Sequence, residues 1–543
     1  MQMRILIYPA FLLVCFLVFM GTTDYGYVTD YLGWLNAYRD GSLRDVVHCF
    51  GYPGNHQFFH LVNYGLFKLI GSHQMAMGFV FIFAHASVCY LIYRTFRLIL
   101  EAVALEQGGL IALFAAIFSA LSPYAIEPLT WDACFHYLLV TALTFGAMNV
   151  LVRYVQTQKT SWLFIHLLLF FLALYTLELS LVAPGIFILY LFFMLWVKND
   201  LKAFRKHFII LTPIYLALLV FYFISTKWMI GSWVGHYGAE KHLNFDPLIL
   251  VSTLAKYFVK QVFFVHFWKF TWKEQVYVWL DDFVIATVFL LVIAGLLLLM
   301  FKKSKHKLLN KVVLAGTLGF AIGLLPVLNL FFVWIGWYEN DRYSYFAAPH
   351  LYLALSALFI ILFKKRYGIA WLVFVFINSF FLSKIIGSVK TAGKLTNELS
   401  ASFAFYDNDH VVLLCTPENT AGVLVFRDYS DVGITLNESL DWLGKGLYQG
   451  NMTNLVQWNP TTEIDSLNVK IIAPNMVQVD IASWGTWFWR KGAGLSNFEN
   501  EHYKVINNGL SFTVEAKDTI RDRIFIFNKG TDWQSIKLPI DEN

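Results

Sequence analysis

The sequence predicts a polytopic α-helical membrane protein with a β-rich domain at its C-terminal end. Of its 543 residues, 58% are hydrophobic and 18% are aromatic, whereas only 14% are charged. Soluble domains carry roughly 25% charged residues, so this composition is typical of a chain that crosses a membrane several times. From about residue 400 the long apolar runs give way to short β-branched and aromatic segments separated by Asn, Gly and Asp, a pattern typical of strands and turns.

Eleven apolar runs are long enough, or nearly so, to cross the hydrocarbon core, which takes about 20 helical residues. They are 4–21, 76–100, 107–123, 135–153, 161–176, 179–197, 208–226, 281–301, 309–335, 346–363 and 368–386. The first run resembles the apolar part of a secretory signal, but no small-residue cleavage site follows it. We therefore expect it to be retained as the first span.

Basic residues predict the orientation of these spans. They fall on every second connection, and they are Arg4; Arg94 and Arg97; Arg153 and Lys159; Lys198, Lys202, Arg205 and Lys206; Lys302, Lys303, Lys305 and Lys307; and Lys364, Lys365 and Arg366. Connections rich in Lys and Arg stay on the cytoplasmic side, so these six segments are predicted to be cytoplasmic. The N-terminus is then inside, and the loops 22–75 and 227–280 and the chain beyond about 387 lie outside.

We therefore predict a transmembrane domain, 1–390, that contains the first outer loop, 22–75, and a β-rich outer domain, 400–543. The five cysteines lack the C-x-x-C spacing of zinc ribbons. No P-loop or glycine-rich nucleotide fingerprint occurs, which argues against an activity driven by ATP.

Two outer loops carry apolar residues at helical spacing and are predicted to form amphipathic helices along the membrane surface. In loop 22–75 these segments are DYLGWLNAYRDG and NHQFFHLVNYGLFKLIG, and loop 227–280 contains several tryptophans and the same kind of pattern. His56, His60 and Asn63 are spaced by four and three residues, so they share one helix face.

Acidic residues and one arginine stand close to the predicted outer surface of the membrane. They are Asp24 after the first span, Glu127 and Asp132 in SPYAIEPLTWD, Glu178 in LYTLELSLVAPG, and Asp341 and Arg342 in WYENDRYSYF. Ionisable groups at this depth are costly, so they tend to face a cavity and one another. The alternative for each is an ordinary interfacial charge or a helix cap.

A polar cavity that opens outward fits two classes of membrane protein. In a transferase, a carboxylate takes the proton from an acceptor hydroxyl, and an arginine holds the departing phosphate of a lipid-linked donor. A transporter or flippase for a lipid-linked or polar solute is expected to show inverted repeats, and the sequence contains no convincing internal repeat. A non-catalytic scaffold, with the β domain as a binding module, is the third alternative. The surface helices and the outer domain favour the transferase.

Five segments, in order along residues 1–390, resemble the GT-C glycosyltransferases, especially the protein O-mannosyltransferases and their tetratricopeptide-containing relatives. The segments are TTDYGYVTDY, HQFFHLVNYGLFKLIG, LSPYAIEPLTWDACFHYLL, TLELSLVAPG and DRYSYFAAPHLYL. The residues on positions of the family pattern are Asp24; His60, Tyr64 and Phe67; Pro123, Glu127 and Trp131; Glu178; and Arg342, Tyr343 and Tyr345. Three positions differ: Thr23 replaces the first acid of a pair, Leu177 replaces a lysine, and CFHY replaces Arg-Lys-Asp after Trp131. The C-terminal β domain has no counterpart in the tetratricopeptide relatives.

This resemblance implies a GT-C-like fold and an inverting transfer of a sugar from a polyprenyl-phosphate donor on the outer face of the membrane. The acceptor would be a hydroxyl of a glycan, a lipid or a protein. Asp24 would be the general base, and Arg342 would bind the donor phosphate with Tyr343 and Tyr345. The residues expected to line the pocket and orient the substrates are His56, His60, Glu127, Asp132 and Glu178.

No cofactor is required by this prediction. A divalent metal ion bound by His56, His60 and Asp24 is the less favoured alternative, because two histidines on a surface helix are more often hydrogen-bonded structure. The predicted partners are the lipid-linked donor, the acceptor and the bilayer, with no nucleic acid. The low cysteine use and compact loops are typical of a bacterial inner-membrane protein with its C-terminal domain in the periplasm.

Overall fold

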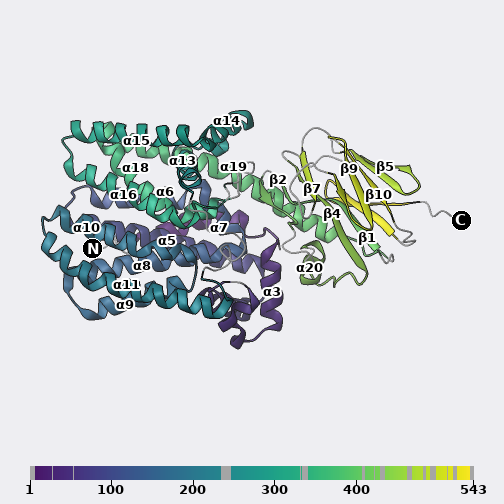
Figure 1. The fold of residues 1–543 in the computed structure, drawn as a ribbon, viewed down its shortest axis with the longest axis horizontal. Helices are drawn as coiled ribbons and strands as arrows, with labels where there is room; N and C mark the ends of the chain where they lie inside the picture. The colour runs from purple at the N-terminus through teal and green to yellow at the C-terminus, as the bar shows by residue number, and fades with distance from the viewer. Residues whose placement is uncertain are drawn as a thin grey trace. The chain divides into compact units, whose positions relative to one another are not determined.

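The computed structural model describes residues 6–538 except 27, 53, 234–245, 331, 333–339, 407–409, 421, 428–434, 461–467, 481–484, 490–496, 510 and 518–522. The chain forms two compact units (Figure 1). One comprises Met1–Met20 and Asp40–Ile385, and the other comprises Gly21–Arg39 and Ile386–Asn543. The stretch Gly21–Arg39, at the beginning of the predicted first outer loop, therefore belongs to the unit that holds the C-terminal β domain. The domain boundaries given from the sequence stay a prediction.

Long apolar helices make up the first unit. They are α2 (Ile7–Phe19), α5 (Gln74–Ala102), α6 (Gly108–Ala120), α8 (Phe135–Thr157), α9 (Thr160–Leu174), α10 (Ala183–Val197), α11 (Leu201–Ile230), α15 (Phe283–Lys303), α16 (Lys307–Leu324), α18 (Ala348–Phe363) and α19 (Tyr367–Ser402), whose last residues belong to the second unit. Each of the eleven predicted spans overlaps one of these helices.

Length and apolar composition support the membrane assignment. Within the described ranges, seven helical segments can cross a membrane, or eight if Gly108–Ala120 and Pro123–Thr130, bent by 57°, form one span. One of the seven, Ala348–Ser402, contains both α18 and α19, and two further apolar helices, Ile7–Thr22 and Thr160–Leu174, are shorter. The prediction of a polytopic helical membrane protein is confirmed.

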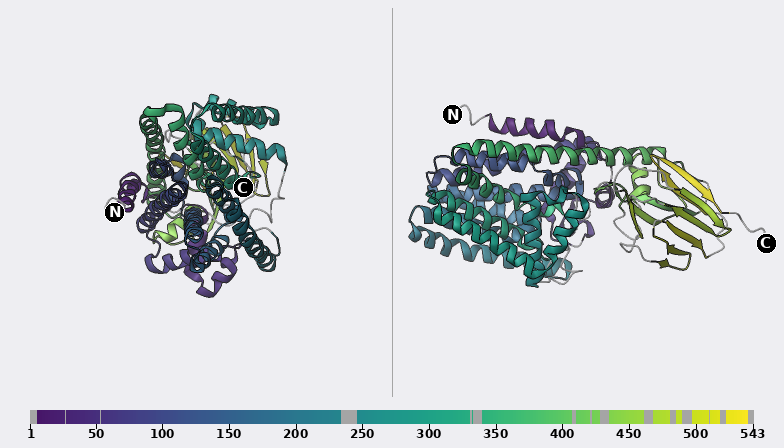
Figure 2. Two further views of the ribbon diagram at one scale, coloured as in Figure 1. Left: turned by 90° about the vertical axis from the view of Figure 1, so that its left-hand side faces the viewer. Right: turned by 90° about the horizontal axis from the view of Figure 1, so that it is seen from above.

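Close helix packing fixes the part of the bundle from which the candidate site is built. The long helices lie side by side (Figure 2), with α5 against α6 and α8, and α16 against α18. A Cβ atom at Gly316 of α16 would lie 2.6 Å from the backbone oxygen of His350 in α18. Only a residue without a side chain permits this approach, as is common between membrane helices. Nδ1 of His350 and the hydroxyl of Tyr190 in α10 are 2.9 Å apart and share a hydrogen bond. This bond connects a third helix to α16 and α18.

Short helices join the long ones. They are η1 (Met20–Thr22), η2 (Leu43–Gly51), α4 (Gln57–Ile70), η3 (Pro123–Ala125), α7 (Ile126–Thr130), η4 (Asp132–Cys134), η5 (Glu178–Val182), α13 (Pro247–Phe263), η6 (Val265–Phe267), α14 (Phe270–Asp281), η7 (Leu325–Val327), α17 (Asp341–Tyr345) and η8 (Lys364–Arg366). The helices predicted for the loops 22–75 and 227–280 are confirmed by α4, α13 and α14, and by α3 (Asp30–Asp40) of the second unit.

The C-terminal part of the second unit contains two five-stranded sheets. The strands are β1 (His410–Pro417), β2 (Asn419–Thr420), β3 (Val423–Leu424), β4 (Asn451–Pro460), β5 (Asn468–Ala473), β6 (Met476–Asp480), β7 (Gly485–Trp489), β8 (Phe498–Glu499), β9 (Tyr503–Asn507), β10 (Ser511–Ala516), β11 (Arg523–Lys529) and β12 (Asp532–Lys537), with helix α20 (Thr435–Trp442) after β3. The first sheet has the order β12-β11-β1-β4-β7 and the second β5-β6-β10-β9-β8, while β2 and β3 pair separately.

One hydrophobic cluster joins the two sheets. Strand β1 runs parallel to both of its neighbours, β4 and β11, whereas every other strand pair is antiparallel within the described residues. Side chains alternate between buried and half-buried along β10, as a strand with one face in a core requires. Val412 and Phe525 of the first sheet and Val479 and Val514 of the second share the core. The expected β-rich domain is therefore confirmed as a sandwich.

We expect Gly316→Ala to lower the thermal unfolding temperature of the detergent-solubilised protein, because the added methyl group forces α16 away from α18. Overpacking of this kind costs about 1–3 kcal/mol. Gly295→Ala in α15 is the matched control, since a Cβ there meets no atom within 4 Å. Equal unfolding temperatures for the two variants would show that α16 and α18 are not in close contact.

Candidate functional site

An ion pair between Glu127 and Arg342 is the centre of the candidate site. Glu127 lies in the short helix α7, after the bend that follows α6, and its side chain is 1% exposed. Its Oε1 atom accepts a hydrogen bond from Nη1 of Arg342, and its Oε2 atom accepts one from the backbone N–H of Arg342 at 2.6 Å. The carboxylate therefore binds both the guanidinium and the start of α17, which holds the arginine in one orientation.

Aromatic rings enclose the guanidinium of Arg342. Its central carbon lies 4.8 Å from the ring centre of Trp131 and 4.5 Å from that of Tyr343. Its Nη2 atom donates to the Tyr343 hydroxyl at 3.0 Å. The indole N–H of Trp131 is buried and has no hydrogen-bond partner among the described residues. Arg342 keeps 15% of its side chain exposed, so one edge of the cation can meet a ligand.

A second ion pair, Lys260 with Asp341, lies beside the first. Both side chains are fully buried, and Lys260 comes from α13, far from α17 in sequence. Next to Lys260, the amide of Gln261 donates to Ser344 at 2.8 Å and accepts from Tyr352 at 2.9 Å. These contacts join loop 227–280 to the helix that carries Arg342. Nothing in the aromatic pattern of that loop predicted the role of Lys260.

Burial in this region opposes the charged forms of ionisable groups, and the opposite charges beside them counteract that effect. Burial raises the pKa of the Asp341 carboxyl well above its usual range, while Lys260 opposes that rise. Burial, together with the positive charge of Lys260, lowers the pKa of the Lys273 ammonium in α14 to about 8. Lys273 is therefore a cation at neutral pH that loses its proton more readily than an exposed lysine.

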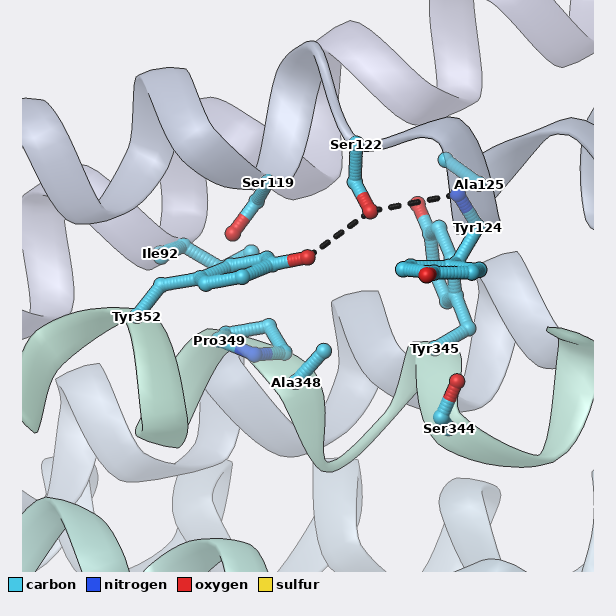
Figure 3. A pocket seen from close by; sticks show the side chains of 10 residues that line it. All are labelled: Ile92, Ser119, Ser122, Tyr124, Ala125, Ser344, Tyr345, Ala348, Pro349 and Tyr352. Carbon is cyan, nitrogen blue, oxygen red and sulfur yellow. Dashed lines mark hydrogen bonds between the residues drawn. The ribbon is translucent and has the colours of Figure 1, made fainter. Parts of the chain in front are cut away.

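Figure 3 shows a small cavity behind α17, between the bend at Ser122 and the start of α18. It has about 10 Å³ for the centre of a water molecule, which is room for about one. The Tyr352 hydroxyl points at Ser122 Oγ, 2.8 Å away, and the backbone N–H of Tyr124 donates to the same Oγ at 3.3 Å. Tyr345 lines the cavity with its ring, while its hydroxyl lies 2.7 Å from Nδ1 of His85 in α5. The cavity is too small for a sugar, and Tyr345 is engaged with the helix bundle.

His56, Glu178 and His136 form a second polar group in the same unit. The Nδ1–H of His56, at the start of α4, donates to the backbone oxygen of Thr176 at 3.1 Å. Its Nε2 atom lies 3.5 Å from Oε1 of Glu178, an ion pair when the imidazole is protonated. The rings of His56 and His136 are 6.3 Å apart.

Aromatic contacts continue from this group to Arg342. The ring centres of His136 and Tyr137 are 4.6 Å apart, and those of Tyr137 and Tyr343 are 6.2 Å apart. Tyr343 in turn accepts the hydrogen bond from Arg342. A series of ring contacts thus links His56 and Glu178 to Glu127 and Arg342, and their joint action in one site stays a prediction.

His60 is buried one turn further along α4, where it is 1% exposed. Rings surround it: the centre of Phe59 is 4.9 Å away, that of Phe50 is 5.8 Å away, and Tyr52 stacks at 6.2 Å. Burial, with a contribution from His56, lowers the pKa of His60 to about 3. His60 is therefore a neutral imidazole at physiological pH.

Two of the predicted site acids, Asp24 and Asp132, make no hydrogen bond or ion pair within the described part of the chain. Asp132 is half-buried at the start of η4, next to Trp131. Asp24 belongs to the second unit, where its side chain is exposed. The absence of a partner within the described residues separates these two acids from Glu127, Glu178 and Asp341.

No group of three or more His, Cys, Asp or Glu in the described ranges is placed to hold a metal ion. His56 and His60 do share the beginning of α4, but one binds Thr176 and Glu178 while the other lies among rings.

No protein-family model matches the sequence, and no curated protein matches it. Among solved structures, the chain is similar to the Archaeoglobus fulgidus oligosaccharyltransferase in complex with Zn and sulfate, at 11% identity and a TM-score of 0.39, over 84% of this chain and 68% of that one. It is also similar to ArnT from Cupriavidus metallidurans bound to undecaprenyl phosphate, at 12% identity and a TM-score of 0.30, over 86% of this chain and 96% of that one. Both TM-scores lie below 0.5, so we base no conclusion on either likeness.

We expect Glu127→Gln to destabilise the protein by about 3 kcal/mol, because it leaves the Arg342 cation buried among rings without its carboxylate. A lower unfolding temperature in detergent is the readout, and the double variant Glu127→Gln, Arg342→Gln should recover part of the loss. Glu101→Gln is the control, since that carboxylate is 44% exposed in its pair with Arg97. Equal effects of Glu127→Gln and Glu101→Gln would contradict the importance of the buried pair.

A second prediction concerns pH. Below about pH 6.5 the unfolded chain binds a proton at His60 that the folded protein, with its pKa of about 3, does not bind. Stability should therefore fall as the pH drops from 6.5 towards 3, by up to roughly 1.4 kcal/mol per unit from this group. His60→Gln should flatten the fall in unfolding temperature with pH, whereas His306→Gln, at an exposed histidine, should not. Identical slopes in all three proteins would refute the buried neutral imidazole.

Proposed function

We propose that the protein is a GT-C-type glycosyltransferase that moves a sugar from a polyprenyl-phosphate donor to a hydroxyl group on the outer face of the membrane. The observation that carries the proposal is the partly exposed Arg342, held by Glu127 and set between Trp131 and Tyr343 at the ends of apolar helices. A guanidinium that is held in one orientation and partly exposed suits a phosphate oxygen. Lys260 and Lys273 add positive potential in the same region.

The reaction requires stabilisation of the leaving phosphate and removal of a proton from the acceptor hydroxyl. Negative charge grows on the lipid phosphate as the bond to the sugar breaks, and cations that are already in place stabilise it without reorganising. The acceptor hydroxyl must lose its proton as it attacks the anomeric carbon from the opposite face, and a carboxylate can take that proton. Attack from the opposite face inverts the anomeric configuration.

We assign the role of general base to Asp24, on the basis of its exposed, unpaired carboxylate and its position in the segment TTDYGYVTDY. Asp132 is the second candidate, because it also lacks a partner within the described residues and follows Trp131 directly. Glu127, Glu178, His56 and His60 would orient the substrates. Tyr343 would contribute its hydroxyl to the phosphate site, and Tyr345 would support it from the bundle.

The test is mass spectrometry of lipid-linked sugars and glycans from cells that carry the wild-type gene, no gene, or Asp24→Asn. Replacement of the carboxylate by an amide keeps its shape and removes its basicity, so transfer should fall by about 10²–10⁴-fold with normal expression. One glycan should lose a single sugar while a lipid-phosphate monosaccharide accumulates. Asp40→Asn, at an exposed acid of the same loop, is the matched control and should behave as wild type.

Asp132→Asn belongs in the same experiment. Loss of transfer in Asp132→Asn with normal transfer in Asp24→Asn would give the base role to Asp132. Unchanged glycan and lipid pools in cells without the gene would contradict the transferase altogether and favour transport of a lipid-linked solute.

A further inference from the structure

The loop that carries Asp24 is packed against the end of α19. Gly21–Arg39 and Ile386–Asn543 form one compact unit. A Cβ atom at Gly393 of α19 would lie 3.0 Å from the backbone oxygen of Asp24 and 3.1 Å from Cα of Tyr25. Gly26, with φ of +103°, leaves similarly little room beside Thr396. The backbone from Asp24 to Gly26 therefore rests directly on the helix that leads into the β domain.

The same loop is bonded to the β domain at its beginning. The hydroxyl of Tyr25, a residue only 5% exposed, donates a hydrogen bond to the backbone oxygen of Leu424 in β3. Tyr25 directly follows Asp24 in the chain. A hydrogen bond from this neighbour limits the backbone rotations that would carry the carboxylate away.

A second set of contacts holds the far end of the loop, in α3. The indole N–H of Trp442, in α20 of the β domain, donates to the side-chain oxygen of Asn36 at 2.9 Å. The guanidinium of Arg39 lies 4.9 Å from the ring centre of Trp442 and donates to Asp441 at 2.8 Å. Because the Arg39–Asp441 pair is largely exposed, its ionic attraction contributes little to stability. The contact of Arg39 with the Trp442 ring therefore provides most of the stabilisation at this end of the loop.

We propose that the C-terminal β domain positions the catalytic loop through this loop clasp, defined as Tyr25, Asn36, Arg39, Asp441 and Trp442. This proposal depends on the proposed role of Asp24, because the clasp residues affect the reaction only by positioning that carboxylate. It fixes the loop at both ends, so Asp24 reaches the acceptor hydroxyl from one direction. A displacement of the base by about 1 Å can cost on the order of a hundredfold in rate.

Three variants test the clasp. Trp442→Phe keeps a ring but removes the donor to Asn36, and Tyr25→Phe removes the donor to Leu424. Each should lower the turnover number about five- to tenfold, the effect of one lost hydrogen bond, with KM for the lipid donor little changed. Asp441→Asn, which removes only the exposed ionic contact and leaves the Trp442 ring beside Arg39, should change the turnover number much less.

The assay uses the lipid fraction of cells that lack the gene, in which the donor accumulates, and follows initial rates over a range of lipid concentrations. Hydrogen exchange of the amides in 21–39 is a second readout. It should quicken in Trp442→Phe while exchange in β10 and β11 stays as in the wild type, which a general loss of folding would not produce. Asp480→Arg is the matched control, because it breaks a surface pair with Lys470 elsewhere on the same domain.

The outcomes separate the two proposals. The clasp is supported if Asp24→Asn has no transferase activity, Trp442→Phe and Tyr25→Phe have a lowered turnover number, and Asp480→Arg has that of the wild type. The clasp is overturned, and the proposed function stays intact, if Asp24→Asn is inactive while Trp442→Phe and Tyr25→Phe keep the wild-type turnover number and exchange rates. Active Asp24→Asn overturns the role of Asp24 and, with it, that of the clasp.

Discussion

The cost of burying charge at the ends of membrane helices is the constraint on which the candidate site depends. Glu127 and Arg342 are taken out of water together, as are Lys260 and Asp341, and removal of one partner would leave an uncompensated charge. Each pair joins segments that are distant in sequence. The same contacts that neutralise the charges therefore hold α7, α13 and α17 against one another. The pairing of these buried charges therefore both stabilises the fold and sets the position of Arg342.

Much of the fold could be predicted from the sequence. A hydrophobic run of about 20 residues has few alternatives to a membrane helix, so every predicted span meets a helix. The convergence of Glu127 with Arg342 also follows from the rule that intramembrane charges seek partners. Lys260 could not be found in this way, because its loop is amphipathic throughout and its burial depends on how α13 packs. The contact of Tyr25 with β3 likewise depends on tertiary structure alone.

The division of the chain into two units associates the β domain with the segment that carries Asp24. The stretch Gly21–Arg39 follows the first span and joins the compact unit whose other part begins only at Ile386. A domain appended only to bind an acceptor has no need of contacts to that stretch. Its hydrogen bonds to Tyr25 and Asn36 connect it instead to the residues around the proposed base.

On the proposed function, the protein breaks the bond between a sugar and a lipid phosphate. The most direct measurement uses purified protein in liposomes, supplied with the lipid-linked monosaccharide from cells without the gene and with their glycan-bearing acceptor fraction. Bare lipid phosphate should appear in proportion to the sugar gained by the acceptor. Intact lipid-linked sugar that only moves between the leaflets would contradict it.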